Sequence, residues 1–168
     1  MDIFDKDALR AISRYFLKTQ ETIAVAESVT GGFLQAAICS AENASVFFHG
    51  GTTAYNAMQK FKHFHVDPVK AMECNCVSEK IAAQMALATI HSFSVDWAIA
   101  VTGYASNIPG SIENLYCCYA IVYKGKLLVN QTYLTDKVNP TEAKLDYVKE
   151  IIGQVLMAFD QKELAISV

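Results

Sequence analysis

A serine followed by hydroxylated and small residues marks the part of this sequence best suited to chemistry. Residues 26–32 read Ala-Glu-Ser-Val-Thr-Gly-Gly and directly follow the apolar run at 22–25. Such a run, ending in small residues, predicts a buried strand that turns into a helix. The amino end of that helix can receive an anion or a polarised carbonyl, and Ser28 would stand where a nucleophile reaches a substrate. An ordinary helix cap is the alternative interpretation of the same residues.

A serine hydroxyl is a poor nucleophile and needs a base. The sequence has no Gly-x-Ser-x-Gly elbow, and none of its 4 histidines stands in a triad context. A lysine can act as the base where burial lowers its pKa. Lys60 is the candidate because it follows Tyr55 by little more than one helical turn, so the two side chains can share a face. Without further evidence, both Lys60 and Lys62 would be interpreted as solvated surface lysines.

Several motifs extend this pattern along the chain. They are Ala-Glu-Ser-Val-Thr-Gly-Gly at 26–32, Gly-Gly-Thr-Thr-Ala-Tyr-Asn at 50–56, Val-Ser-Glu at 77–79 and Ala-Val-Thr-Gly at 100–103. In this order they resemble the carboxy-terminal domain of the CinA competence/damage-inducible family, over about residues 9–156. Active members of that family hydrolyse the amide of nicotinamide mononucleotide.

The resemblance implies roles for three side chains. In the CinA-type amidohydrolases, the serine of the Ala-Glu-Ser block works with a tyrosine and a lysine of the block Ala-Tyr-x-x-x-x-Lys. That block stands intact at residues 54–60. Ser28 is then the nucleophile, Lys60 its proton acceptor, and Tyr55 an orienting or proton-relaying partner. Without the resemblance, Tyr55 would be an amphipathic residue at the edge of the core.

The implied reaction is an acyl transfer that needs neither a metal nor a redox cofactor. Ser28 attacks the carboxamide carbon, ammonia leaves, and water releases the acid. We expect backbone N–H groups near Thr30, Gly31 and Gly32 to stabilise the oxyanion. We also expect Glu27 to be one of the substrate-binding residues. It would lie buried and stabilise the turn through hydrogen bonds.

The remaining substrate contacts implied by the resemblance are Thr102, Gly103 and Lys144. Lys144 aligns roughly with a family arginine and keeps its charge without the bidentate fork that suits phosphate. The chain departs from the family at residues 104–110, where a glycine-rich loop is replaced, and at 116–119, where bulky residues replace small ones. These departures affect the shape of the substrate site more than the pair of Ser28 and Lys60.

Two hypotheses about function follow. The first is an amidohydrolase acting on nicotinamide mononucleotide or a related pyridine nucleotide. The second is a catalytically weak or inactive paralogue that keeps the fold as a nucleotide-binding or interaction module. The intact Ser28, Tyr55 and Lys60 favour the enzyme, whereas the altered loop favours the paralogue.

Hydrophobic periodicity predicts alternating helices and strands. Helices are expected at 5–19, 30–41, 56–65, 79–93 and 141–159, and strands at 22–26, 46–55, 97–101, 115–123 and 127–134. This order predicts a single domain spanning residues 1–168, of the α/β class, with a three-layer α/β/α arrangement around a mixed, partly parallel sheet. Ligands bind beyond the carboxyl ends of strands in such sheets, and Ser28, Tyr55 and Thr102 each lie at or just beyond such an end.

Composition limits the range of partners. The 168 residues are 52% hydrophobic and 18% charged, which excludes a disordered chain. A net charge of −3 without a basic block argues against nucleic acid as a partner. The polar start and short apolar runs argue against a signal peptide and a membrane span. We therefore expect a cytoplasmic protein with a small-molecule nucleotide as its partner. The family tendency and the apolar hairpin face suggest a homodimer.

The 5 cysteines do not follow the spacing of a disulfide framework. The vicinal pair at 117–118 lies in an apolar run, which indicates packed, reduced thiols. A zinc-dependent hydrolase built on His63, His65, Cys74 and Cys76 is a third hypothesis. One-residue spacings within both pairs differ from those of structural zinc sites, so the sequence predicts no metal.

Overall fold

A mixed sheet of five strands organises the molecule. The computed structural model describes residues 3–107 and 114–166. The strands are β1 (Ile23–Glu27), β2 (Phe48–Thr53), β3 (Trp97–Gly103), β4 (Tyr116–Tyr123) and β5 (Lys126–Leu134). Their order is β2-β1-β3-β4-β5, with β1 parallel to β2 and β3 and the other neighbouring pairs antiparallel. The partly parallel sheet is thus confirmed.

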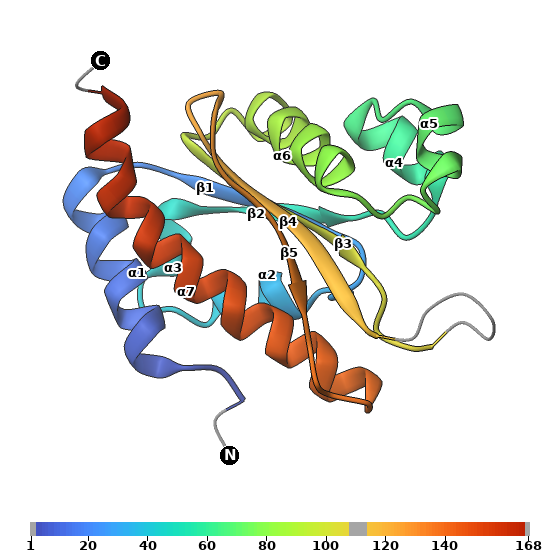
Figure 1. Ribbon diagram of the computed structural model, residues 1–168. Helices are drawn as coiled ribbons and strands as arrows, with labels where there is room; N and C mark the ends of the chain where they lie inside the picture. Colours follow the sequence, from blue (N-terminus) through green and yellow to red (C-terminus); the bar gives the residue numbers. More distant parts are fainter. Residues whose placement is uncertain (1–2, 108–113, 167–168) are drawn as a thin grey trace.

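Helices cover both faces of this sheet (Figure 1). They are α1 (Lys6–Thr19), α2 (Phe33–Cys39), α3 (Ala44–Phe47), α4 (Ala57–Phe64), α5 (Pro68–Glu73), α6 (Glu79–Phe93) and α7 (Pro140–Ile166). α1, α2, α3 and α7 share one core with the sheet, and α4, α5 and α6 share the other. The three-layer α/β/α class is therefore confirmed. In the described part of the chain, no helix is long and apolar enough to cross a membrane.

The central strands are buried on both faces, and their side chains alternate in size. Ile23 and Val25 of β1 face the core beneath α1 and α7, whereas Ala24 and Ala26 face α6. The same alternation continues in β3, with Trp97, Ile99 and Val101 on the first face and Ala98 and Ala100 on the second. Because alanine adds little bulk, α6 can pack closely on the second face.

Side-chain caps begin two of the predicted helices. The side chain of Asp5 accepts hydrogen bonds from the N–H groups at the start of α1, and Ser78 does the same for α6. The predicted hairpin also forms, with Lys124 and Gly125 at positive φ in its turn. Such left-handed turns match the twist of the paired strands.

Several predicted boundaries were wrong, and the closing helix, expected to end at residue 159, continues to Ile166. The helix expected from residue 30 begins at Phe33, because Gly31 and Gly32 have φ of 59° and 105° and form a turn first. The strand expected over 46–55 begins as the short helix α3 and becomes a strand only at Phe48. Gly51 lies where β2 and β1 approach closely, since a Cβ there would lie 2.5 Å from a methyl group of Val25.

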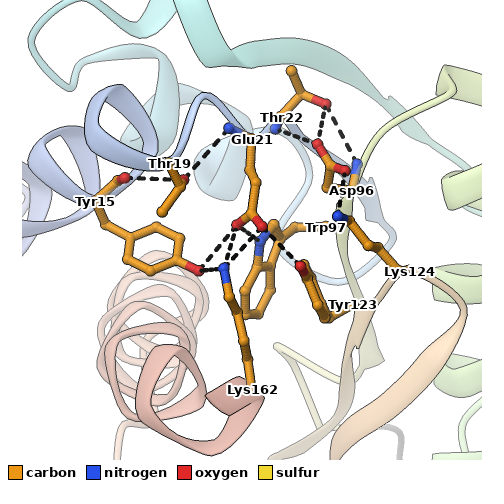
Figure 2. Close-up of polar contacts among 9 residues, drawn as sticks. All are labelled: Tyr15, Thr19, Glu21, Thr22, Asp96, Trp97, Tyr123, Lys124 and Lys162. Carbon is orange, nitrogen blue, oxygen red and sulfur yellow. Dashed lines mark hydrogen bonds and ion pairs between the residues drawn. The ribbon is translucent and has the colours of Figure 1, made fainter. Parts of the chain in front are cut away.

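A largely buried ion pair joins the far part of α7 to the amino end of the sheet (Figure 2). Lys162 Nζ donates to both carboxylate oxygens of Glu21, at 2.8 and 2.9 Å. Glu21 also accepts hydrogen bonds from the hydroxyls of Tyr15 and Tyr123 and from Trp97 Nε1. These contacts fix the direction in which α7 crosses its face of the sheet.

Candidate active site

A pocket opens at the carboxyl ends of the parallel strands, where the strand order predicted a ligand site. Its volume is about 470 Å³. The segments that follow β1, β2 and β3 all contribute to its lining, as do α4 and the loop after α5. The lining residues are Ser28, Val29, Tyr55, Asn56, Ala57, Lys60, Met72, Asn75, Cys76, Val77, Thr102, Gly103, Tyr104, Ala105 and Ser106.

Lys60 carries its amine into this pocket from α4. Asn56 caps that helix by accepting the N–H of Gln59, which sets the helix start and therefore the direction of Lys60. The lysine is only 2% exposed. Its Nζ donates to Ser28 Oγ at 2.9 Å and to the carbonyl oxygen of Ala54 at 3.3 Å. The structure thus brings together the serine and the lysine that the sequence paired.

The environment of Lys60 favours the neutral amine. No carboxylate lies within ion-pair distance of Nζ among the residues that the structure describes. Burial lowers the pKa of Lys60, and the nearby thiol of Cys76 opposes that effect only in part. A neutral amine beside a serine hydroxyl can take its proton, which is the property required of a general base.

Glu27 is fully buried and belongs to the turn rather than to the pocket lining. One carboxylate oxygen accepts hydrogen bonds from Thr30 Oγ1 and from the N–H groups of Gly32 and Leu34, and the other accepts from the N–H of Gln35. The predicted brace is confirmed. The anion expected at the amino end of this helix is therefore the protein's own carboxylate.

This arrangement corrects the expected oxyanion donors. The N–H of Gly32 donates to Glu27, and the N–H of Gly31 donates to the carbonyl oxygen of Ser28 at 3.2 Å. Thr30 also directs its hydroxyl to Glu27. None of these three residues is among those that line the pocket.

Thr102 and Gly103 lie in the pocket wall and hold neighbouring segments. Thr102 Oγ1 donates to the carbonyl oxygen of Cys76 at 2.8 Å, which ties the loop after α5 to the end of β3. A Cβ on Gly103 would lie 2.5 Å from the carbonyl oxygen of Tyr116. Only glycine therefore allows β4 to approach β3 so closely at this point.

Tyr55 and Lys144 lie at the margins of the site. Tyr55 lines the pocket but is 72% exposed, and its hydroxyl has no hydrogen-bond partner within the described residues. Lys144 of α7 lies outside the pocket lining, and its Nζ is 4.0 Å from the position that a Cβ on Gly31 would take. The geometry places Lys144 beside the serine turn without an ion-pair partner in the described part of the chain.

Asn75, Cys76 and Tyr104 are among the lining residues that were not predicted as site residues. Asn75 and Cys76 both have positive φ and close the loop after α5, where the N–H of Cys76 donates to the carbonyl oxygen of Ala71. No helix was assigned to the α5 segment from the sequence, so there was no indication of the loop that follows this helix. Across residues 3–107 and 114–162, no group of three or more His, Cys, Asp or Glu side chains could hold a metal ion.

Comparison with known proteins assigns the family. A model of the CinA C-terminal domain matches residues 5–140. The chain belongs to the CinA C-terminal domain family. A CinA-like protein of Synechocystis is 39% identical over 110 residues, which cover 65% of this chain and 26% of that protein. Protein YdeJ of Escherichia coli is 36% identical over 94 residues, or 56% of this chain and 55% of that protein.

Solved structures agree with this CinA assignment. The competence/damage inducible protein CihA of Agrobacterium tumefaciens superposes with a TM-score of 0.86 at 23% identity, covering 94% of this chain and 99% of that one. A CinA superfamily protein of Escherichia coli gives 0.76 at 27% identity, covering 92% and 89%. At 23% identity the CihA match shows the fold alone. The chain spans about a quarter of the length of the CinA-like relatives that it matches.

Proposed function

We propose that this CinA-family chain is an amidohydrolase that cleaves the carboxamide of nicotinamide mononucleotide, or of a related pyridine nucleotide, to the acid and ammonia. One observation carries the proposal. A buried lysine without a carboxylate partner in the described residues lies 2.9 Å from the hydroxyl of a buried serine, at the edge of a pocket. A lysine kept only for stability would be exposed or paired with an acid.

The reaction follows from this pair. The neutral amine of Lys60 takes the hydroxyl proton of Ser28 as Oγ attacks the carboxamide carbon. The resulting ammonium is held by the carbonyl oxygen of Ala54 and returns the proton to the leaving nitrogen, so ammonia departs and an acyl ester remains on Ser28. Lys60 then takes a proton from water as the water oxygen attacks the ester, and it gives that proton to Ser28 Oγ as the ester bond breaks and the acid is released. The N–H of Val29 is our candidate oxyanion donor, because it follows the nucleophile and Val29 lines the pocket.

The direct test is to incubate the purified protein with nicotinamide mononucleotide and measure ammonia. We expect release by the wild type and loss of at least three orders of magnitude in rate in Ser28→Ala. An ordinary helix cap at Ser28 would instead give about 1 kcal/mol of lost stability with activity retained. Lys62→Met, an exposed lysine on the same helix, is the matched control and should keep full activity.

A nucleotide-binding module without catalysis is the second candidate. The observation that favours it is Tyr55, whose exposed ring makes no hydrogen bond within the described residues. Saturable binding of the nucleotide without ammonia release would identify this module. The homodimer and the cytoplasmic location stay predictions; light scattering of the purified protein tests the first and fractionation of the source cells the second.

A further inference from the structure

Tyr104 follows β3 directly and is the most firmly held aromatic residue of the pocket. Its N–H donates to the carbonyl oxygen of Tyr116 at 2.9 Å, and its own carbonyl oxygen accepts the hydroxyl of Tyr147 at 2.8 Å. Tyr147 is fully buried in α7, so this second bond ties the pocket wall to the opposite helical layer. Both polar groups of the Tyr104 backbone are therefore fixed.

The side chain of Tyr104 is fixed as well. Its ring packs edge-to-face with Tyr116, with 5.5 Å between the centroids and 68° between the planes. Asn75 lies beside its hydroxyl and partly offsets the rise in the pKa of Tyr104 that burial causes. Tyr55, on the same pocket, is 72% exposed and has no such support in the described residues. One aromatic side of the pocket is thus rigid before any ligand binds, which reduces the entropy cost of stacking on it.

The surroundings of this ring suit a flat, weakly polar group. Among the described residues, the lining contains no carboxylate, and Lys60 is its one basic side chain. The same lining includes the apolar side chains of Val77 and Ala105. Aromatic rings favour flat partners through offset or edge-to-face contacts. A saturated ring of the same size is thicker and cannot make the same contact.

We infer that Tyr104 is the specificity-determining residue of this pocket: its braced ring holds a flat aromatic acyl group beside Ser28, so flat aromatic amides are accepted and saturated ones are excluded. This inference rests on the proposed function for its choice of amides. It assigns to Tyr104 a role that neither Ser28 nor Lys60 can provide, because both act on the carboxamide and not on the ring attached to it.

The test compares the binding of two probes by calorimetry, benzamide and cyclohexanecarboxamide, which share the carboxamide and the size of the ring. We expect the wild type to bind benzamide about tenfold more tightly. Tyr104→Leu should reduce the difference below about twofold, whereas Tyr104→Phe, which keeps the ring, should retain it. Equal binding of the two probes by the wild type, or an unchanged preference in Tyr104→Leu, would overturn the inference.

Further measurements separate this inference from the proposed function. Tyr116→Leu removes the edge contact without touching the backbone bonds of Tyr104, and it should also weaken the preference for benzamide if Tyr104→Leu fails to fold. An undiminished preference in Tyr116→Leu counts against a braced ring. Should the protein release no ammonia from any amide yet bind benzamide selectively through Tyr104, the amidase proposal fails and the role of Tyr104 stands.

Discussion

Two largely buried lysines lie at opposite ends of the sheet, and their different surroundings give them different roles. Lys60 meets a hydroxyl and a carbonyl oxygen at the carboxyl end of β1. Lys162 meets the carboxylate of Glu21 at the amino end and is 13% exposed (Figure 2). The rings of Tyr15 and Tyr123 each lie 5.0 Å from its Nζ. Lys162 therefore has a carboxylate partner, whereas Lys60 has none among the described residues.

The consequences for charge are opposite. Burial alone would raise the pKa of Glu21, but hydrogen bonds from Lys162, Trp97 and the two tyrosines outweigh it and hold the pKa at about 2. Burial lowers the pKa of Lys60, which has no such partner among the described residues. A paired charge stabilises the fold at neutral pH, whereas an unpaired one is costly and available for proton transfer. The comparison therefore assigns a structural role to Lys162 at the amino end of β1 and a role in proton transfer to Lys60 at its carboxyl end.

The largest effect should come from Lys60→Met. We expect ammonia release to fall by several orders of magnitude, as for Ser28→Ala, because the proton acceptor is lost. The free energy of unfolding should not fall, because the variant no longer buries an unpaired amine. Rates and denaturant unfolding curves measured on the same preparation provide both values. A strongly destabilised Lys60→Met would place this lysine in the structural class beside Lys162.

Lys162→Met should show the reverse pattern. Removing one partner of a buried ion pair leaves the other charge uncompensated, so we expect a loss of about 2–3 kcal/mol in the free energy of unfolding. Three neutral donors remain on Glu21, which limits the loss. The rate of ammonia release below the melting temperature should stay within about twofold. Lys149→Met, an exposed lysine of the same helix, is the control, and equal stability of the two variants would contradict the prediction.

The contrast also explains which parts could be read from the sequence. The Ser28 turn is a local pattern that could be read from the sequence directly, whereas the role of Lys60 came from the resemblance of residues 54–60 to a CinA block. Glu21 and Lys162 stand 141 residues apart, and no local signal connects them. Tyr104 and Asn75 meet for the same reason only after folding. Long-range pairs of this kind need the topology before they can be predicted.

The wrong predictions have physical causes as well. Val46, Phe47 and Phe48 have strong strand propensity, yet only Phe48 enters the strand, because Asn43 in the left-handed region starts a turn of helix before it. The oxyanion donors were assigned from a general property of helix starts. That property was right about an anion and wrong about its source, since Glu27 immediately before Ser28 occupies the position.

Acid should lower the stability that Glu21 contributes at the amino end of β1. The folded pKa of Glu21 is about 2, below its ordinary value of 4.5, so the ionised carboxylate is favoured by folding. The resulting stability is fully present above about pH 4.5 and is lost as pH falls towards 2. Unfolding midpoints measured across this range should fall more steeply in the wild type than in Glu21→Gln. Parallel curves would show that Glu21 is not the group responsible.

The smallest expected effect is the pH dependence of ammonia release, which reports on Lys60 at the carboxyl end of β1. The neutral amine of Lys60 is the base, and burial lowers its pKa below the ordinary 10.5, so the rate should rise with pH and level off before that value is reached. Between the folded pKa and 10.5 the unfolded chain binds more protons at this site, so stability should also rise with pH there. Lys62→Met should keep both profiles. A rate that still climbs through 10.5 would mean that Lys60 is an ordinary lysine, and the distinction between the two ends of β1 would then be one of packing alone.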